Sequence, residues 1–189
     1  MMKLTEAGMT LAETLVAIAL TGIVAGVVVT QLVSPRASGE STALIQNLSG
    51  LGHAVQAYRG NVGRYPAALT DLTEMPEAGV SDLCGRSVPP HLLAEWRGPY
   101  LTREVQEAGI AVGEATMLND LRREPESPGT AAYGVLYVDV TDVRLELAES
   151  VEAAFDGNAQ LEDGSVRWTA SADDDEIGKL SYGIPLRGC

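Results

Sequence analysis

The longest uncharged stretch of the chain lies near its beginning. Residues 14–33 read TLVAIALTGIVAGVVVTQLV, without a charge or a proline. A helix of about 20 residues, at about 1.5 Å per residue, spans roughly the 30 Å hydrocarbon core of a bilayer. Because a backbone in lipid must satisfy its own hydrogen bonds, this stretch predicts a membrane-spanning helix.

After an interruption at 34–36, the pattern becomes amphipathic. Apolar residues recur at spacings of four, three, four and three, which places them on one face of a helix. They are Leu44, Leu48, Leu51, Val55 and Tyr58. We predict that the first helix continues to about Arg59, weakened locally at Gly50 and Gly52, and that this half covers a soluble domain. The alternative is a linker at Pro35 followed by a separate helix.

The second half of the chain alternates between β-rich and helical patterns. The expected strands are 110–118, 133–140, 165–171 and 179–186. A helix over 143–155 is expected between them, capped by Asp142. Its apolar face would consist of Val143, Leu147, Val151 and Ala154. These elements predict an α+β fold, in which an antiparallel sheet of about three or four strands packs on the carboxyl half of the first helix.

The residues before the apolar run form a short polar leader, MMKLTEAG, which ends at Gly8. An ordinary secretory signal has its apolar run before the cleavage point, whereas cleavage after Gly8 would leave the apolar helix on the mature protein. Glu13 lies at the edge of that helix, where placing a carboxylate in lipid is costly. Either Glu13 stays at the wet interface, or it pairs with a cation such as a new amino terminus at Met9 of a neighbouring subunit.

The order GMTLAE at 8–13, followed by an apolar run with Gly22 partway along, resembles the class III signal of type IV prepilins and type II secretion pseudopilins. The resemblance implies three segments: a leader at 1–8, a transmembrane assembly helix at 9–33 and a pilin-like globular domain at 34–189. It also implies cleavage between Gly8 and Met9 by a prepilin peptidase and N-methylation of Met9.

The same resemblance gives Glu13, with Thr10 and Leu11, a role in the assembly and register of subunits. Two positions depart from the family pattern. Met9 stands where phenylalanine is more usual, and Thr30 stands where many members have a helix-kinking proline.

Two later segments also resemble the family, and in particular the major pseudopilin. Residues 60–72, GNVGRYPAALTDL, read as a turn followed by a short helix containing Asp71, and 96–101, WRGPYL, resemble a W-G-x-P-Y segment. Tyr65 and Trp96 would anchor an irregular loop to the first helix. The helix expected at 143–155 departs from the smallest major pseudopilins and indicates a larger or minor subunit.

The two cysteines, Cys84 and Cys189, permit two interpretations. In an oxidising compartment they would form a disulfide that closes a loop near 100 residues, worth up to about 4.7 kcal/mol in the chain-entropy model. Otherwise they are two separate thiols.

A run of four acidic residues offers a calcium site, since carboxylates are good calcium ligands and the major pseudopilins carry calcium in a comparable carboxy-terminal loop. The run consists of Asp173, Asp174, Asp175 and Glu176. The alternative is a solvated turn, because consecutive side chains project in different directions. Asp156-Gly157 is better explained as a helix-terminating turn than as part of an EF-hand loop, because Leu161 stands where that loop needs a glycine.

The overall charge and the absence of catalytic motifs narrow the function further. A net charge of −13 argues against nucleic acid as the main partner. The chain has no G-x-S-x-G motif and no phosphate-binding glycine loop, and its two histidines, His53 and His91, fit surface or boundary positions. We therefore expect no enzymatic activity and no required cofactor.

Together these features predict a structural subunit of a secretion pseudopilus or type IV pilus-like filament. The expected partners are homologous pilin-like subunits, a prepilin peptidase and an inner-membrane assembly platform. The expected location is the inner membrane, crossed once, with the carboxyl-terminal domain in the periplasm or outside the cell. The alternative is a membrane-anchored binding domain that does not polymerise.

Overall fold

The computed structural model describes residues 35–125, 133–157 and 161–189. In it, helix α2 (Pro35–Val62) carries the amphipathic face that the sequence predicts. The five predicted face residues, Leu44 to Tyr58, are each at most 1% exposed. The helix runs through Gly50 and Gly52 without interruption and ends at Val62, slightly beyond the predicted Arg59. Gly63 follows with a φ of 69°, the left-handed conformation that commonly ends a helix. The chain divides into two units, 1–39 and 40–189, and the second unit contains the sheet and the hydrophobic core.

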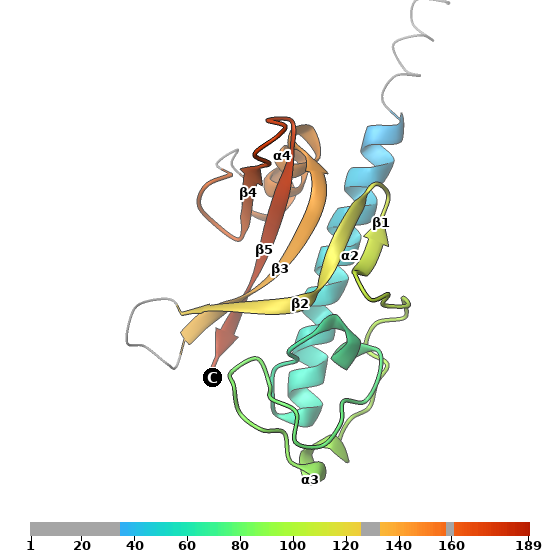
Figure 1. Ribbon diagram of the computed structural model, residues 1–189, viewed down its shortest axis with the longest axis vertical. Coiled ribbons are helices and arrows are strands. Elements are labelled where there is room, and N and C mark those ends of the chain that lie inside the picture. Colours follow the sequence, from blue (N-terminus) through green and yellow to red (C-terminus); the bar gives the residue numbers. More distant parts are fainter. Residues whose placement is uncertain (1–34, 126–132, 158–160) are drawn as a thin grey trace, which may run out of the picture. The chain divides into compact units, whose positions relative to one another are not determined.

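Five antiparallel strands form a single sheet in the order β1-β2-β3-β5-β4 (Figure 1). The strands are β1 (Gly109–Val112), β2 (Ala115–Pro125), β3 (Tyr133–Arg144), β4 (Val166–Ala170) and β5 (Ile177–Arg187). The predicted α+β class is confirmed, although the sheet has more strands than the three or four expected. The last strand in the sequence, β5, lies inside the sheet between β3 and β4.

The expected strand at 110–118 is wrong, because this segment is a hairpin. Val112 pairs with Ala115, and Gly113 takes a φ of 65° in the turn between β1 and β2. Glycine supplies this backbone conformation at little steric cost. The apolar residues on both sides of the turn made two short strands look like one.

The helix expected at 143–155 begins two residues later, as α4 (Leu145–Phe155), and its N-cap is Arg144 rather than Asp142. Asp142 instead lies in β3 with a φ of 61°, where the register with β5 shifts between Val140 and Val143. This irregularity extends the strand through residues that the sequence pattern assigned to the helix. The expected helix face is therefore wrong in part: Val143 is buried in β3, and Ala154 is exposed.

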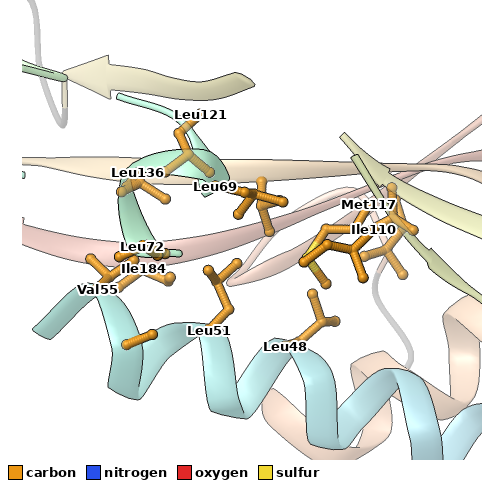
Figure 2. Packing of buried hydrophobic residues seen from close by; sticks show 14 of the residues in the cluster. Leu48, Leu51, Val55, Leu69, Leu72, Ile110, Met117, Leu121, Leu136 and Ile184 are labelled. Carbon is orange, nitrogen blue, oxygen red and sulfur yellow. The ribbon is translucent and has the colours of Figure 1, made fainter. Parts of the chain in front are cut away.

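The hydrophobic core lies between α2, the short 3-10 helix η1 (Leu69–Leu72) and one face of the sheet. Figure 2 shows Leu48, Leu51 and Val55 of α2 pointing toward residues of η1 and the strands. Those facing residues include Leu69, Leu72, Ile110, Met117, Leu121, Leu136 and Ile184. Fully burying side chains of this size contributes about 1.5–3 kcal/mol each before conformational entropy is counted.

The segment between η1 and β1 is irregular apart from α3 (Pro90–Leu93), and aromatic side chains hold it on the core. The indole Nε1 of Trp96 donates a hydrogen bond to the backbone oxygen of Asp71 at 3.2 Å. The Tyr100 ring lies edge-on to both Trp96 and Tyr58, with ring centroids 5.6 and 5.7 Å away. Trp96 thus anchors the loop, but its hydrogen bond goes to η1, and Tyr100 is the residue whose ring contacts Tyr58 of the first helix.

Candidate functional site

The predicted leader and assembly residues lie outside the described residues. This applies to the cleavage pair Gly8 and Met9 and to Thr10, Leu11 and Glu13. Within the described ranges, no helix combines the length and the apolar character needed to cross a bilayer. The functional features that the structure does describe belong to the unit 40–189.

Cys84 and Cys189 form a disulfide, with their Cα atoms 5.5 Å apart. The bond joins the irregular segment to the residues that follow β5, across 105 positions of sequence. The same end of β5 is also held by Tyr65, whose hydroxyl accepts a hydrogen bond from the backbone nitrogen of Arg187 at 2.9 Å. The predicted anchoring role of Tyr65 therefore includes fastening the end of β5.

Asp82 organises the loop that carries Cys84. Its side chain is fully buried, and its Oδ1 accepts hydrogen bonds from the backbone nitrogens of Cys84 and Arg86 at 2.9 and 2.7 Å. Its Oδ2 pairs with the guanidinium of Arg86 at 3.0 Å and lies 3.6 Å from Nε of Arg64. A buried carboxylate requires such partners, so Asp82 fixes the loop in the conformation that presents Cys84 to Cys189.

Four arginines belong to or contact the two segments that this disulfide joins, and we call them the arginine cluster: Arg59, Arg64, Arg86 and Arg187. Arg59 donates a hydrogen bond to the backbone oxygen of Arg187 at 2.6 Å and stacks on the Tyr65 ring. Asp82 is the only described carboxylate that forms an ion pair with any of the four. The cluster thus carries excess positive charge in a chain whose net charge is −13.

The predicted calcium residues, Asp173, Asp174, Asp175 and Glu176, all lie exposed in the loop between β4 and β5. We call this segment, 173–176, the acidic loop. Oδ1 of Asp174 accepts a hydrogen bond from the backbone nitrogen of Glu176 at 2.8 Å, as in a local turn. In the part of the chain that the structure describes, no three acidic, histidine or cysteine side chains converge to hold a metal ion. Calcium binding here remains a prediction without support from the geometry.

Asp156 has a structural role that the sequence pattern did not indicate. As predicted, it ends α4, and Gly157 follows with a φ of 74°. In addition, its Oδ2 accepts hydrogen bonds from the backbone nitrogens of Ser165 and Val166 at 2.8 and 2.9 Å. The carboxylate thereby joins the end of α4 to the start of β4.

The sheet face opposite the core carries a network of charges around Tyr137. This ring is only 2% exposed because the guanidinium carbons of Arg122 and Arg167 lie 5.1 and 5.0 Å from its centroid. Glu124 pairs with both arginines. On the next strand, Gly183 leaves room for the ring, since a Cβ there would approach Tyr137 Cε1 to 3.0 Å. The network joins β2, β3 and β4, and its cations are already paired.

Asp139 extends this network and makes stability depend on pH. Burial opposes its ionisation, but the hydrogen bond from Ser181 at 2.6 Å and the charges of Arg122 and Lys179 outweigh burial and lower the pKa of Asp139. A carboxyl group with a lowered pKa in the folded state stabilises the fold above its unfolded pKa, and this stabilisation is lost as the pH falls through the folded value.

We therefore expect the urea concentration at the unfolding midpoint of the full chain to decrease when the pH is lowered from 7 to 3. The decrease should be smaller in Asp139→Asn than in the parent. The difference should appear below about pH 4, near the ordinary pKa of aspartate. Urea titrations at the two pH values measure it. Asp142→Asn, which changes an exposed carboxylate of the same strand, is the control and should follow the parent. An equal fall in parent and Asp139→Asn would contradict the assigned role.

Comparison of the chain with protein-family models, with curated proteins and with solved structures finds no match. The sequence offered the disulfide as one of two interpretations and indicated the aromatic anchors, but it did not indicate the role of Asp82 or the arginine cluster. The one available signal for Asp82 was its position two residues before a cysteine, in a loop with Gly85, a pattern typical of turns in which an aspartate accepts local backbone hydrogen bonds.

Proposed function

We propose that this chain is a structural subunit of a type II secretion pseudopilus or a type IV pilus-like filament. The observation that carries the proposal is the order GMTLAE at 8–13, directly before an uncharged run that ends at Val33. In this proposal, cleavage after Gly8 exposes Met9, and the apolar helix anchors the subunit in the inner membrane until assembly.

The described unit supports the proposal through its compatible architecture. A helix that buries one face against an antiparallel sheet suits a subunit whose amino-terminal half packs in a filament while its carboxyl-terminal half carries a domain. The disulfide supports a location outside the cytoplasm, because such bonds persist in oxidising compartments. The partners would be homologous subunits, a prepilin peptidase and an assembly platform, and no enzymatic activity or cofactor is part of the proposal.

Glu13 has a specific role in the proposed assembly. A carboxylate at the edge of an apolar helix is costly in lipid unless a cation neutralises it. The new ammonium group at Met9 of a neighbouring subunit would provide that cation and would set the register between adjacent helices, with Thr10 and Leu11 beside it.

The proposal predicts that the mature chain from membranes of the native host begins with N-methyl-Met9. Intact mass and amino-terminal sequencing measure this directly. Gly8→Ala should leave the leader attached, because the residue before the scissile bond is part of the peptidase signal. Ala7→Gly, a change of similar size one position earlier, is the control and should be processed normally.

Glu13→Ala separates processing from assembly. It should yield a chain that starts at Met9 but enters sheared filament fractions at a much lower level. Normal filament assembly by Glu13→Ala would exclude the pairing with Met9. An intact Met1 terminus, or cleavage beyond Val33, would instead favour a binding domain that does not polymerise.

A further inference from the structure

Two clusters of unbalanced charge in the described unit lie at opposite ends of one strand. The acidic loop, 173–176, directly precedes β5 (Ile177–Arg187), and the last residue of that strand belongs to the arginine cluster. Figure 1 shows β5 running from the β4–β5 connection to the labelled carboxyl terminus. A strand rises about 3.4 Å per residue, so roughly 30 Å separate the two ends. Over this distance the acidic loop cannot pair with the arginine cluster of its own chain.

Each cluster lacks the partners that its charge calls for. All four residues of the acidic loop are exposed. None of their carboxylates forms an ion pair with a described residue. The four arginines share only Asp82, and the side chain of Arg187 is exposed and forms no ion pair within the described ranges. By contrast, the charges around Tyr137 are matched within the molecule.

Three of the four arginines are held in place by contacts within the molecule. Arg64 and Arg86 are oriented by the buried carboxylate of Asp82, and Arg59 is oriented by the backbone oxygen of Arg187 and by the Tyr65 ring. Arginine guanidinium groups oriented in this way suit the binding of carboxylates, because their planar donors match carboxylate geometry. The cluster is therefore complementary to a protein surface that carries carboxylates.

We propose that copies of this chain contact one another head to tail, with the acidic loop of one copy against the arginine cluster of the next. The occupant is a second copy because the same chain presents both complementary surfaces. A contact between two different surfaces is heterologous, and it generates an open helical filament unless the rotation between copies closes a ring. This inference rests on the proposed function because the filament is where the copies would meet. The contact itself does not require cleavage of the leader.

Photo-crosslinking of the full chain in membranes tests the contact. The photo-reactive amino acid p-benzoylphenylalanine is placed at position 172, beside the acidic loop and exposed. The expected product is an adduct of two subunits whose joined peptide, identified by mass spectrometry, contains Arg187 or Arg86. An adduct that maps to another part of the chain, or that joins only a different protein, would overturn the proposal.

Charge reversal makes the test specific. Asp175→Arg and Arg187→Glu should each reduce the adduct about three- to tenfold, since each places like charges opposite one another. Both changes in one chain should restore it, because the pair is then reversed but complementary. Glu149→Arg, at an exposed position of α4, is the control for net charge and should leave the adduct unchanged. Formation of the Cys84–Cys189 bond, read on non-reducing gels, verifies folding of every variant.

The outcomes separate this inference from the proposed function. Normal processing at Gly8 with no effect of either reversal would remove the head-to-tail contact and leave the filament proposal standing. A chain that keeps Met1 but shows the adduct and its rescue would retain the contact and remove the pilin-like function.

Discussion

Replacing Cys84 and Cys189 together by serine is expected to lower the free energy of unfolding by about 2–5 kcal/mol. The bond joins residues 105 positions apart, so its loss restores a large amount of conformational freedom to the unfolded chain. It also releases the end of β5, an interior strand that pairs with both β3 and β4. At about 2–4 °C per kcal/mol for a chain of this size, the midpoint of thermal unfolding should fall by about 5–15 °C.

Circular dichroism of the purified full chain measures this midpoint. If the bond accounts for the effect, then Cys84→Ser and Cys189→Ser alone should each lose about as much as the double variant, because either change removes the same bond. Reduction of the parent protein should reproduce the loss. A double variant that unfolds within about 1 °C of the parent would show that the bond contributes little to stability.

Leu51→Ala should destabilise the unit by about 2–5 kcal/mol. Leu51 is 1% exposed. It projects from α2 into the core, toward residues of η1 and the sheet (Figure 2). Truncation removes apolar contact on several sides at once, and the helix backbone limits how far the neighbours can close the space. The loss of apolar burial therefore adds to the cost of a cavity.

Gln56→Ala is the matched control for Leu51→Ala. It shortens an exposed side chain on the same helix and favours helix formation slightly, so the urea midpoint should stay close to that of the parent. Urea unfolding of parent and both variants at one pH provides the comparison. Equal midpoints for Leu51→Ala and Gln56→Ala would show that α2 does not supply the core as described.

The elements that were predicted well depend on local periodicity. Apolar residues at spacings of three and four identified the buried face of α2. The β-rich patterns at 133–140, 165–171 and 179–186 identified strands β3, β4 and β5, although β3 and β5 extend beyond their predicted bounds. Side-chain direction repeats every 3.6 residues in a helix and every two in a strand, so a short window contains enough information.

The elements that were predicted poorly depend on a turn or on the register between strands. The hairpin of β1 and β2 turns at Gly113-Glu114 between residues that are apolar on both sides. Asp142 is a plausible helix cap by residue type, but pairing between β3 and β5 holds it in the strand. A residue that suits two local structures takes the one that long-range pairing favours.

The sequence by itself determined the uncharged run at 14–33, the GMTLAE order before it, the amphipathic face of α2 and the presence of two cysteines. These are properties of composition and spacing, and they require no partner far away in the chain. Only the tertiary structure decided that β5 lies inside the sheet and that Asp82 is buried between two arginines. It also decided that Arg59 and Arg64 contact the two segments that the disulfide joins, which carry Arg86 and Arg187. Such groupings depend on contacts between residues as many as 128 positions apart, which form only when the chain is folded.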